Sequence, residues 1–492
     1  MMVQMLSITA KMPTPTSTTL NPTPPVPANR PLKTLPGSYG WPLIGPLSDR
    51  LNYTWFQGQE KFFRSRMEKH NSSVFRTNVP PCFPFFIGVN PNVIAVLDCQ
   101  SFSHMFDMDI IEKKDVLVGD FMPSVKFTGN MRVCAYLDPT EEHHTKIKGF
   151  AMDILKKSSG IWVSSLISSL DTMWTTIDGS LSKDGTASLF TPLQKCLFNF
   201  LCKSIVGADP ANYSPEMSES GHIMLDKWLG VQLLPTVNIG LFQPLEEIFL
   251  HSFSYPFFLV KGDYNKLANF VAKEGKEMVR HGQTEFGLSE QEAIHNLIFI
   301  LGFNAFGGFS VFFPTLFSIL AKNDGGVQEI LKKEVKEKCT SSTLLSFSAV
   351  KDMPYVQSFV YEALRLNPPV PLQYGRARKD FVLGSHESSF EVKKGELLCG
   401  FQKLVMRDPN VFDDPESFVS DRFVGEKGLK LLDYLYWSNG PQSSNPHISN
   451  KQCAAKDYVA HTACLFVAYF FLRYDSVKVD SSGNIIGLEK AG

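Results

Sequence analysis

The chain has 492 residues, 43% of them hydrophobic and 40 of them Phe, so it is long enough to build a large aromatic core in one or two domains. Its net charge of −1 gives no electrostatic basis for a nucleic-acid partner. The 9 cysteines are an odd number without a C-x-x-C pair, which argues against a disulfide framework or a zinc ribbon and favours a reducing compartment.

The first 33 residues differ in composition from the rest of the chain. They contain Lys11, Arg30 and Lys33, no Asp or Glu, and many Ser, Thr and Pro. A basic, hydroxylated leader without acidic residues is typical of a plastid transit peptide, and a disordered tail without targeting information is the alternative. We expect residues 1–33 to form such a disordered leader and residues 34–492 to form one folded, functional domain.

Hydrophobic patterning predicts a mainly helical, single-domain fold of the α+β class. Residues 74–97 are expected to form short strands separated by prolines. Helices are expected over residues 140–209 and 246–338, in a segment that ends near Leu366, and over residues 456–473. The strands are therefore minor and lie toward the two ends of the chain.

One apolar segment is long enough to cross a bilayer, because residues 297–320 are 24 residues without a charge. Ser289 and Glu292 match a capping box that would start a helix in water just upstream, and Pro314 interrupts the run. A helix buried on all sides in a large protein has the same composition. We therefore expect a long central core helix, with Asn304 as a buried amide that needs hydrogen-bond partners.

Three motifs in the second half of the chain follow one another in a characteristic order. Glu362 and Arg365 share one helix face, Arg422 follows, and the loop after Gly440 leads to Cys453 at the start of a helix. This order resembles that of the cytochrome P-450 superfamily. The resemblance implies a P-450-type fold with buried haem, a structural triad of Glu362, Arg365 and Arg422, and Cys453 as the axial ligand of the iron. A thiolate at a helix N-terminus is stabilised by free N–H groups, and as a haem ligand it favours O–O cleavage.

The chain departs from the superfamily pattern in two places. The usual loop reads F-x-x-G-x-R-x-C, whereas here the segment between Gly440 and Cys453 is longer by nine residues and Lys451 replaces the Arg. The central helix reads G-F-N-A-F-G-G around Asn304, where oxygen-activating members carry an acid followed by Thr. Those groups deliver protons to iron-bound dioxygen, which neither Asn nor Phe can do. An NADPH-dependent monooxygenase is therefore disfavoured.

The same departures resemble a plant branch of the superfamily that metabolises fatty-acid hydroperoxides. The resemblance runs from Leu35 to the C-terminus and includes L-P-G-S-Y-G-W-P-L-I-G-P, K-K-D-x-x-x-G-x-x-M-P-S, Y-L-D-P, N-A-F-G-G, W-S-N-G-P and N-K-Q-C-A-A-K-D. It implies haem b, a fatty-acid hydroperoxide substrate that brings its own oxygen, and no reductase. It also implies location in the chloroplast, with envelope association and peripheral membrane contact.

The resemblance also assigns roles to individual residues. The positions that bind the haem propionates match four basic residues: Lys113, His144, Lys148 and Lys451. Lys and His donate hydrogen bonds to carboxylates, although a basic pair on a helix is more often a solvated surface. Asn304 matches the amide that positions the hydroperoxide group. Leu117 matches a position that is aromatic in allene oxide synthases and aliphatic in hydroperoxide lyases, and a generic pocket-lining Leu is the alternative.

The function implied is that of a 13-hydroperoxide lyase in oxylipin biosynthesis. Homolytic O–O cleavage at ferric haem and an unstable hemiacetal would convert hydroperoxides of linolenic or linoleic acid into hexenal or hexanal and a twelve-carbon ω-oxo acid. An allene oxide synthase or divinyl ether synthase of the same branch is the first alternative. A monooxygenase and a non-enzymatic haem- or lipid-binding protein are the remaining ones.

Overall fold

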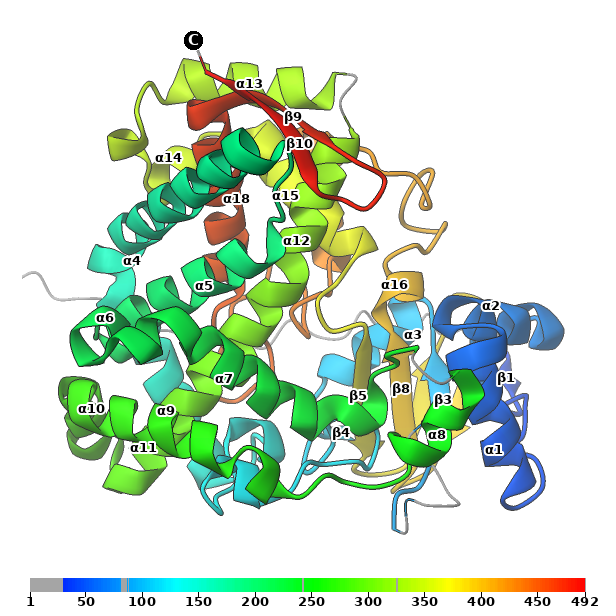
Figure 1. Cartoon of the computed structure of the whole chain (residues 1–492). Helices are drawn as coiled ribbons and strands as arrows, with labels where there is room; N and C mark the ends of the chain where they lie inside the picture. Colours follow the sequence, from blue (N-terminus) through cyan, green and yellow to red (C-terminus); the bar gives the residue numbers. More distant parts are fainter. Residues whose placement is uncertain (1–29, 81–85, 87, 241–242, 324–325, 492) are drawn as a thin grey trace, which may run out of the picture.

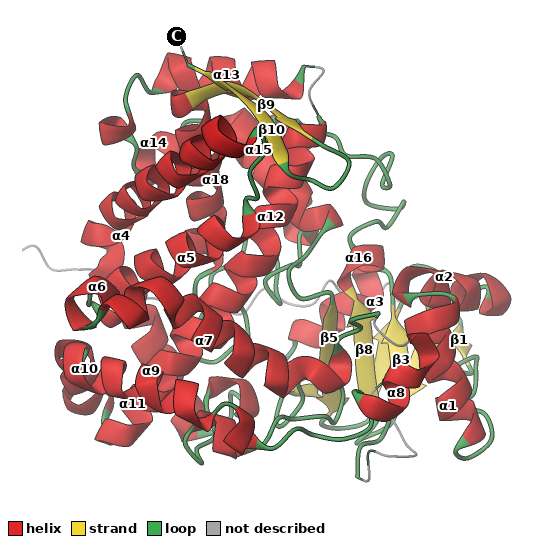
Figure 2. Ribbon diagram, in the orientation of Figure 1, coloured by secondary structure: helices red, strands yellow, loops and turns green. Residues whose placement is uncertain are grey.

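The computed structural model describes residues 30–80, 86, 88–240, 243–323 and 326–491. Helices form most of it, as the sequence predicts (Figure 2). The α-helices are α1 (Ile44–Leu51), α2 (Gln59–His70), α3 (Cys99–Ser103), α4 (Glu142–Asp184), α5 (Phe190–Leu201), α6 (Pro210–Tyr213), α7 (Pro215–Leu233), α8 (Glu246–Phe249), α9 (Lys261–Glu274), α10 (Lys276–Phe286), α11 (Glu290–Phe299), α12 (Gly307–Lys322), α13 (Val327–Lys338), α14 (Phe347–Lys351), α15 (Pro354–Leu366), α16 (Gln402–Val405), α17 (Gly425–Lys430) and α18 (Lys456–Arg473).

The strands form small sheets that lie beside the helical part (Figure 1). They are β1 (Leu32–Lys33), β2 (Val74–Asn78), β3 (Asn92–Val96), β4 (Ile111–Glu112), β5 (Leu372–Ala377), β6 (Phe381–Gly384), β7 (Ser389–Val392), β8 (Leu397–Phe401), β9 (Tyr474–Val479) and β10 (Ile485–Lys490). The largest sheet has the order β2-β3-β8-β5-β4, the second β1-β7-β6, and β9 pairs with β10. The strands predicted within residues 74–97 are thus present as β2 and β3.

The folded part of the chain includes residues that the composition assigned to the leader. Leu32–Lys33 form β1, which pairs in parallel with β7 through Leu32 and Ser389. The Arg30 guanidinium donates a hydrogen bond to the carbonyl of Ser385. Residues 30–33 therefore lie in the fold, because the edge of a sheet accepts a short strand whatever its composition. The leader expected in residues 1–29 lies outside the described residues.

A long helix formed by α11, the π-helical segment η9 (Ile300–Phe306) and α12 crosses the centre of the molecule (Figure 1). It begins at the predicted capping box, in which Ser289 and Glu292 bond reciprocally. Among the described helices, Glu290–Lys322 has the length and hydropathy to cross a membrane, and half of its apolar stretch is buried. Because α5, α7 and α15 pack against it, it is a central helix of the fold, as expected.

A buried ion network joins the end of α15 to the segment before α17. Arg365 donates from Nε and Nη2 to both carboxylate oxygens of Glu362, at 2.7 and 2.8 Å. The Nε atom of Arg422 lies 3.0 Å from the same carboxylate, and both Glu362 and Arg365 are fully buried. The structure thus brings together the three residues of the expected triad. Removal of one charge would leave the others buried and uncompensated, which costs about 3–5 kcal/mol in proteins.

Candidate active site

Cys453 lies where the long loop meets α18. Its backbone N–H donates to the carbonyl of Ser438 at 2.9 Å, and its carbonyl accepts from the N–H of Lys456 at 3.1 Å. A Cβ atom on Gly440 would come within 2.9 Å of the Gln452 side chain. The absence of a side chain at Gly440 therefore lets the two ends of the loop come into contact, with the extra residues between them.

The surroundings of the Cys453 sulfur contain groups that stabilise an anion. Burial raises the pKa of the thiol, while the backbone N–H of Ala455 and the ammonium groups of Lys148 and Lys456 act to lower it. Because burial has the larger effect, the pKa of the free thiol stays above its ordinary value, and a metal ion bound to the sulfur would displace the proton. The donor at Ala455 and the nearby cations therefore suit a thiolate that ligates a metal.

Side chains on both sides of the inserted segment hold it in place. The indole N–H of Trp437 donates to Gln442 at 2.9 Å, and the ammonium of Lys456 donates to the Gln442 carbonyl. From α4, the Lys148 ammonium donates to the carbonyl and the side chain of Asn450 and to the carbonyl of Gln452, the last at 2.8 Å. All three ammonium protons of Lys148 thus form hydrogen bonds with the loop, so this residue fixes the position of the segment that contains Cys453.

The four basic residues expected to bind propionates come from three separate segments and lie close together. Burial and then the charge of Lys451 lower the pKa of Lys113 to about 7. Burial, Lys451 and Lys148 lower the pKa of His144 to about 3. Burial also lowers the pKa of Lys148, to about 8. Several cations buried beside one another are costly unless an anion joins them.

This cluster has donors left for such an anion. Lys451 uses two protons on the carbonyls of Cys134 and Leu137, at 2.8 and 2.7 Å, and Lys113 uses one on Tyr374 at 2.6 Å. In the described part of the chain, the ring nitrogens of the buried His144 make no hydrogen bond of normal geometry, and the backbone of Ile448 lies near enough to raise the pKa of the ring. Ammonium and imidazole donors fit the paired carboxylates of a haem, so Lys113, His144 and Lys451 suit the propionates while Lys148 is already engaged.

The prediction that Asn304 is a buried amide is wrong, because its side chain is exposed. It makes no hydrogen bond to any residue in the described part of the chain. It lies within the π-helical segment η9, whose i→i+5 bonds make a wider turn than those of an α-helix. The amide is therefore free to bind a ligand.

Leu117 lies four residues after Lys113, in the same segment between β4 and α4. Its neighbours Val116 and Val118 pack against the apolar cluster around β3 and β8. Leu117 itself is half-buried and belongs to neither apolar cluster of the described core. Its side chain is thus available to line a substrate pocket.

Comparison with known proteins identifies the family. Residues 135–443, more than half of the chain, match the family Cytochrome P450. The chain belongs to the cytochrome P450 family. Members of this family bind a haem iron, for which the basic cluster and the Cys453 loop provide suitable groups. The family match ends ten residues before Cys453, where the inserted segment lies.

Several plant cytochromes P450 are similar to this chain over most of its length. A chloroplastic fatty acid hydroperoxide lyase of Solanum lycopersicum is 62% identical over 95% of this chain and 98% of its own. A chloroplastic linolenate hydroperoxide lyase of Arabidopsis thaliana is 55% identical over the full length of both chains. A chloroplastic allene oxide synthase of Solanum lycopersicum is 41% identical over 94% of this chain and 85% of its own.

Sequence reasoning missed one residue that organises this P450 site. Asp138 is buried, and its carboxylate accepts from the backbone N–H of Lys113 at 2.7 Å and from Arg378 at 2.9 Å. It therefore fixes the backbone that carries Lys113 and supplies a negative charge beside the cations. Its presence in the motif Y-L-D-P was the available signal, because an Asp before Pro in a short motif is a common turn residue.

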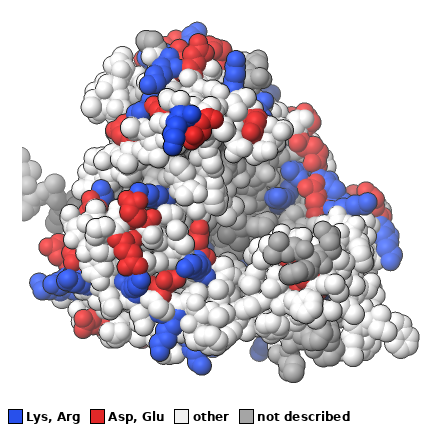
Figure 3. Space-filling model, in the orientation of Figure 1, with Lys and Arg blue, Asp and Glu red and all other residues white. Residues whose placement is uncertain are grey.

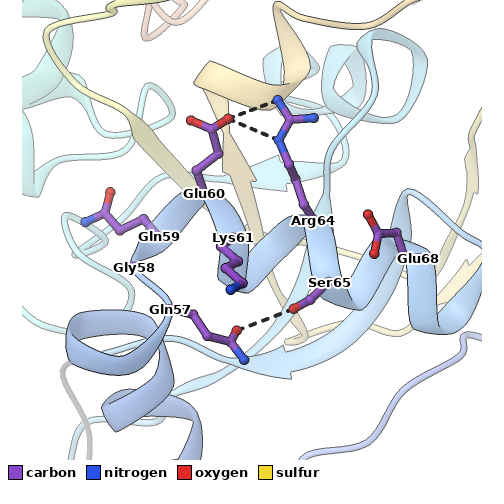
Figure 4. Close-up of a pocket in the computed structure, with 8 residues that line it drawn as sticks. All are labelled: Gln57, Gly58, Gln59, Glu60, Lys61, Arg64, Ser65 and Glu68. Carbon is purple, nitrogen blue, oxygen red and sulfur yellow. Dashed lines mark hydrogen bonds and ion pairs between the residues drawn. The ribbon is translucent and has the colours of Figure 1, made fainter.

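Two other features of the described chain do not contribute to this site. Asp98, His386 and Asp408 lie together, but their carboxylates accept backbone N–H groups and a protonatable His, so they form a structural network. A cleft of about 550 Å³ lies along α2, where Glu60 and Arg64 bond to each other (Figure 4). The polar groups in this cleft largely satisfy one another and lie at the edge of the molecule, as Figure 1 shows for α2.

Proposed function

We propose that this P450 is a chloroplast fatty-acid hydroperoxide lyase that uses haem b ligated by Cys453. Two relatives named as hydroperoxide lyases match it over nearly the whole chain, at 62% and 55% identity, against 41% for an allene oxide synthase. The observation that carries the mechanism is Asn304, an exposed amide in the π-helical turn where oxygen-activating members have an acid and Thr. The substrate therefore supplies the oxygen, and no reductase takes part.

Each residue of the site has a defined task in this reaction. Bound haem supplies homolytic cleavage of the substrate O–O bond. Asn304 donates its amide N–H to the hydroperoxide group and orients it, and the Cys453 thiolate increases the electron density available for cleavage. The rearranged substrate becomes a hemiacetal and breaks into an aldehyde and an ω-oxo acid. Because the products contain all the atoms of the substrate, no oxidant or reductant is consumed.

The substrate class is the 13-hydroperoxides of linolenic and linoleic acid. The name of the Arabidopsis thaliana relative contains linolenate, which supports this choice. The test is to add 13-hydroperoxylinolenic acid to purified holoenzyme in the absence of oxygen and NADPH and to follow the loss of substrate. Rapid consumption supports the proposal. Turnover that requires NADPH and a reductase would instead support a monooxygenase.

Leu117→Phe is expected to shift the products from the aldehyde and oxo acid toward those of an allene oxide. An aromatic ring at this half-buried position would contact the substrate radical and stabilise it by its π face, whereas Leu offers only aliphatic contact. We expect the product ratio to change by about tenfold, which corresponds to about 1.4 kcal/mol between two competing barriers. Leu117→Ile is the control. An unchanged ratio in Leu117→Phe would show that this residue does not select the product.

We also propose that the enzyme contacts the chloroplast envelope through an apolar face formed by two segments, residues 41–56 and the described parts of 237–259, which are 237–240 and 243–259. The exposed apolar side chains there are Trp41, Leu43, Ile44, Leu47, Phe56, Val237, Ile239, Leu245, Ile248, Phe249, Phe253, Phe258 and Leu259. The region over α1 and α8 is mostly white in Figure 3. Large exposed apolar patches on a folded protein mark protein or membrane contacts, and the substrate is itself a lipid.

The charged side chains of these two segments form ion pairs with one another or with neighbouring residues. This arrangement supports a lipid partner. In their described parts, Arg50 pairs with Glu247, and Glu246 lies 3.1 Å from His251. Asp49 is bound by Arg66 at 2.6 Å. The outer face is thus left without a charge that would have to be desolvated on contact with lipid.

Binding to envelope-lipid vesicles tests this face. Trp41→Ser combined with Phe258→Ser is expected to weaken cosedimentation about tenfold or more, since each aromatic side chain buries roughly 150–250 Å². Ile161→Ser combined with Phe190→Ser, two exposed apolar positions outside the face, is the control. Equal effects of the two pairs would refute the assignment of the face.

A further inference from the structure

Two glycines frame the π-helical turn that carries Asn304. Gly302 and Gly307 are five residues apart, and the N–H of Gly307 donates to the carbonyl of Gly302. This i→i+5 bond is the one that defines a π-helix, a form that is rare and occurs frequently at functional sites. The two glycines are therefore separated by one π-helical turn and lie on the same face of η9.

The side of α7 packs directly against these glycines. A Cβ atom on Gly302 would lie 2.8 Å from both Leu225 and Trp228. A Cβ atom on Gly307 would lie 3.4 Å from Leu229. Leu225, Trp228 and Leu229 share one face of α7 because they are spaced i, i+3 and i+4. The close approach of α7 to η9 thus depends on the absence of a side chain at position 302.

Trp228 has no freedom to move away from Gly302. It is fully buried, and its indole N–H donates to the carbonyl of Phe127 at 2.9 Å. Its ring stacks on Tyr264 at 5.9 Å and meets the edge of Phe299 at 6.4 Å. Phe299 in turn stacks on Phe303, the residue before Asn304, at 4.7 Å. A shift of Trp228 would therefore displace Phe299 and Phe303, and with them the segment that carries the Asn304 amide.

We propose that Gly302 is a positioning residue for Asn304, because it lets Trp228 close against η9 and so maintains the wide turn that exposes the amide. The inference rests on the role of Asn304 in the proposed function. Ala at position 302 would force α7 outward or the turn into another register. In either case the amide changes direction, while the Cys453 loop and the basic cluster stay as they are.

Gly302→Ala tests this proposal, with Gly230→Ala as the matched control. Gly230 is an exposed residue of α7, and a Cβ on it meets no atom within 4 Å. We expect Gly302→Ala to keep its haem content and absorption spectrum and to lose about 10²-fold in kcat, the cost of a displacement of about 1 Å in a reacting group. Hydrogen exchange is expected to change in the peptide that covers residues 300–307. Gly230→Ala should change neither kcat nor the exchange of this peptide.

The comparison with Asn304→Ala separates this inference from the proposed function. If Gly302 acts through Asn304, Gly302→Ala added to Asn304→Ala lowers kcat no further. A full additional loss in the double variant would overturn the positioning role. An Asn304→Ala enzyme with normal kcat would instead overturn the role of the amide itself. If Gly302→Ala does not fold, Trp228→Phe is the substitute, since it loosens the same contact, and it is expected to lower kcat in the same non-additive way.

Discussion

Cys453→Ser is expected to lower hydroperoxide turnover by at least about a thousandfold, equivalent to about 4 kcal/mol of barrier. The alcohol of Ser does not ionise at neutral pH, so it cannot act as the thiolate ligand that favours O–O cleavage. The N–H of Ala455 and the ammonium of Lys148, which stabilise an anion at this position, would then have no anionic partner. The absorption spectrum of the reduced carbon-monoxide complex and the rate of substrate loss measure the two effects.

Cys464→Ala is the control for this substitution. Cys464 is buried on α18, eleven residues after Cys453, and burial together with the charge of Glu334 raises the pKa of its thiol far above the usual range. It should lose some stability and keep both the thiolate spectrum and the activity. A Cys453→Ser protein that retained the thiolate spectrum would show that another cysteine ligates the iron.

Lys451→Met is expected to weaken haem retention by about 10–100-fold, the usual cost of removing a partner that orients the ligands of a metal centre. Lys451 joins the cysteine loop to the carbonyls of Cys134 and Leu137, so both the charge and a structural link are lost. The rate of haem transfer to apomyoglobin measures the effect.

Lys430→Met provides the matched control, because Lys430 is exposed and pairs only across one helical turn with Glu426. It should transfer haem at the wild-type rate. Lys148→Met should differ from Lys451→Met, since Lys148 holds the loop through Asn450 and Gln452. We expect Lys148→Met to change the thiolate spectrum as well as to lower the affinity for haem. Identical behaviour of the three Lys variants would contradict the separate roles assigned here.

Local sequence signals predicted the elements that depend on short-range physics. The helix over residues 456–473 and the helix that ends at Leu366 occur with the expected bounds, as α18 and α15. The capping box at Ser289 and Glu292 is formed because both partners lie within one helical turn. Hydrophobic patterning predicted the mainly helical α+β class, and the family resemblance supplied the P-450-type fold, which periodicity alone does not specify.

Features that depend on contacts between distant segments were not predictable in this way. Asn304 is exposed in a π-helical turn, and α7, some eighty residues earlier, packs against this turn at Gly302. The engagement of Lys148 with the cysteine loop joins residues about three hundred positions apart. Neither contact leaves a periodic pattern in the sequence, so only the folded chain shows them.

Mass spectrometry of the products is the most direct test of the central claim. The purified holoenzyme is mixed with 13-hydroperoxylinolenic acid and no other reactant. The proposed lyase is expected to give hexenal and a twelve-carbon ω-oxo acid in equal amounts, with no incorporation of oxygen from labelled dioxygen. Products derived from an allene oxide, or a hydroperoxide recovered unchanged, would contradict the account.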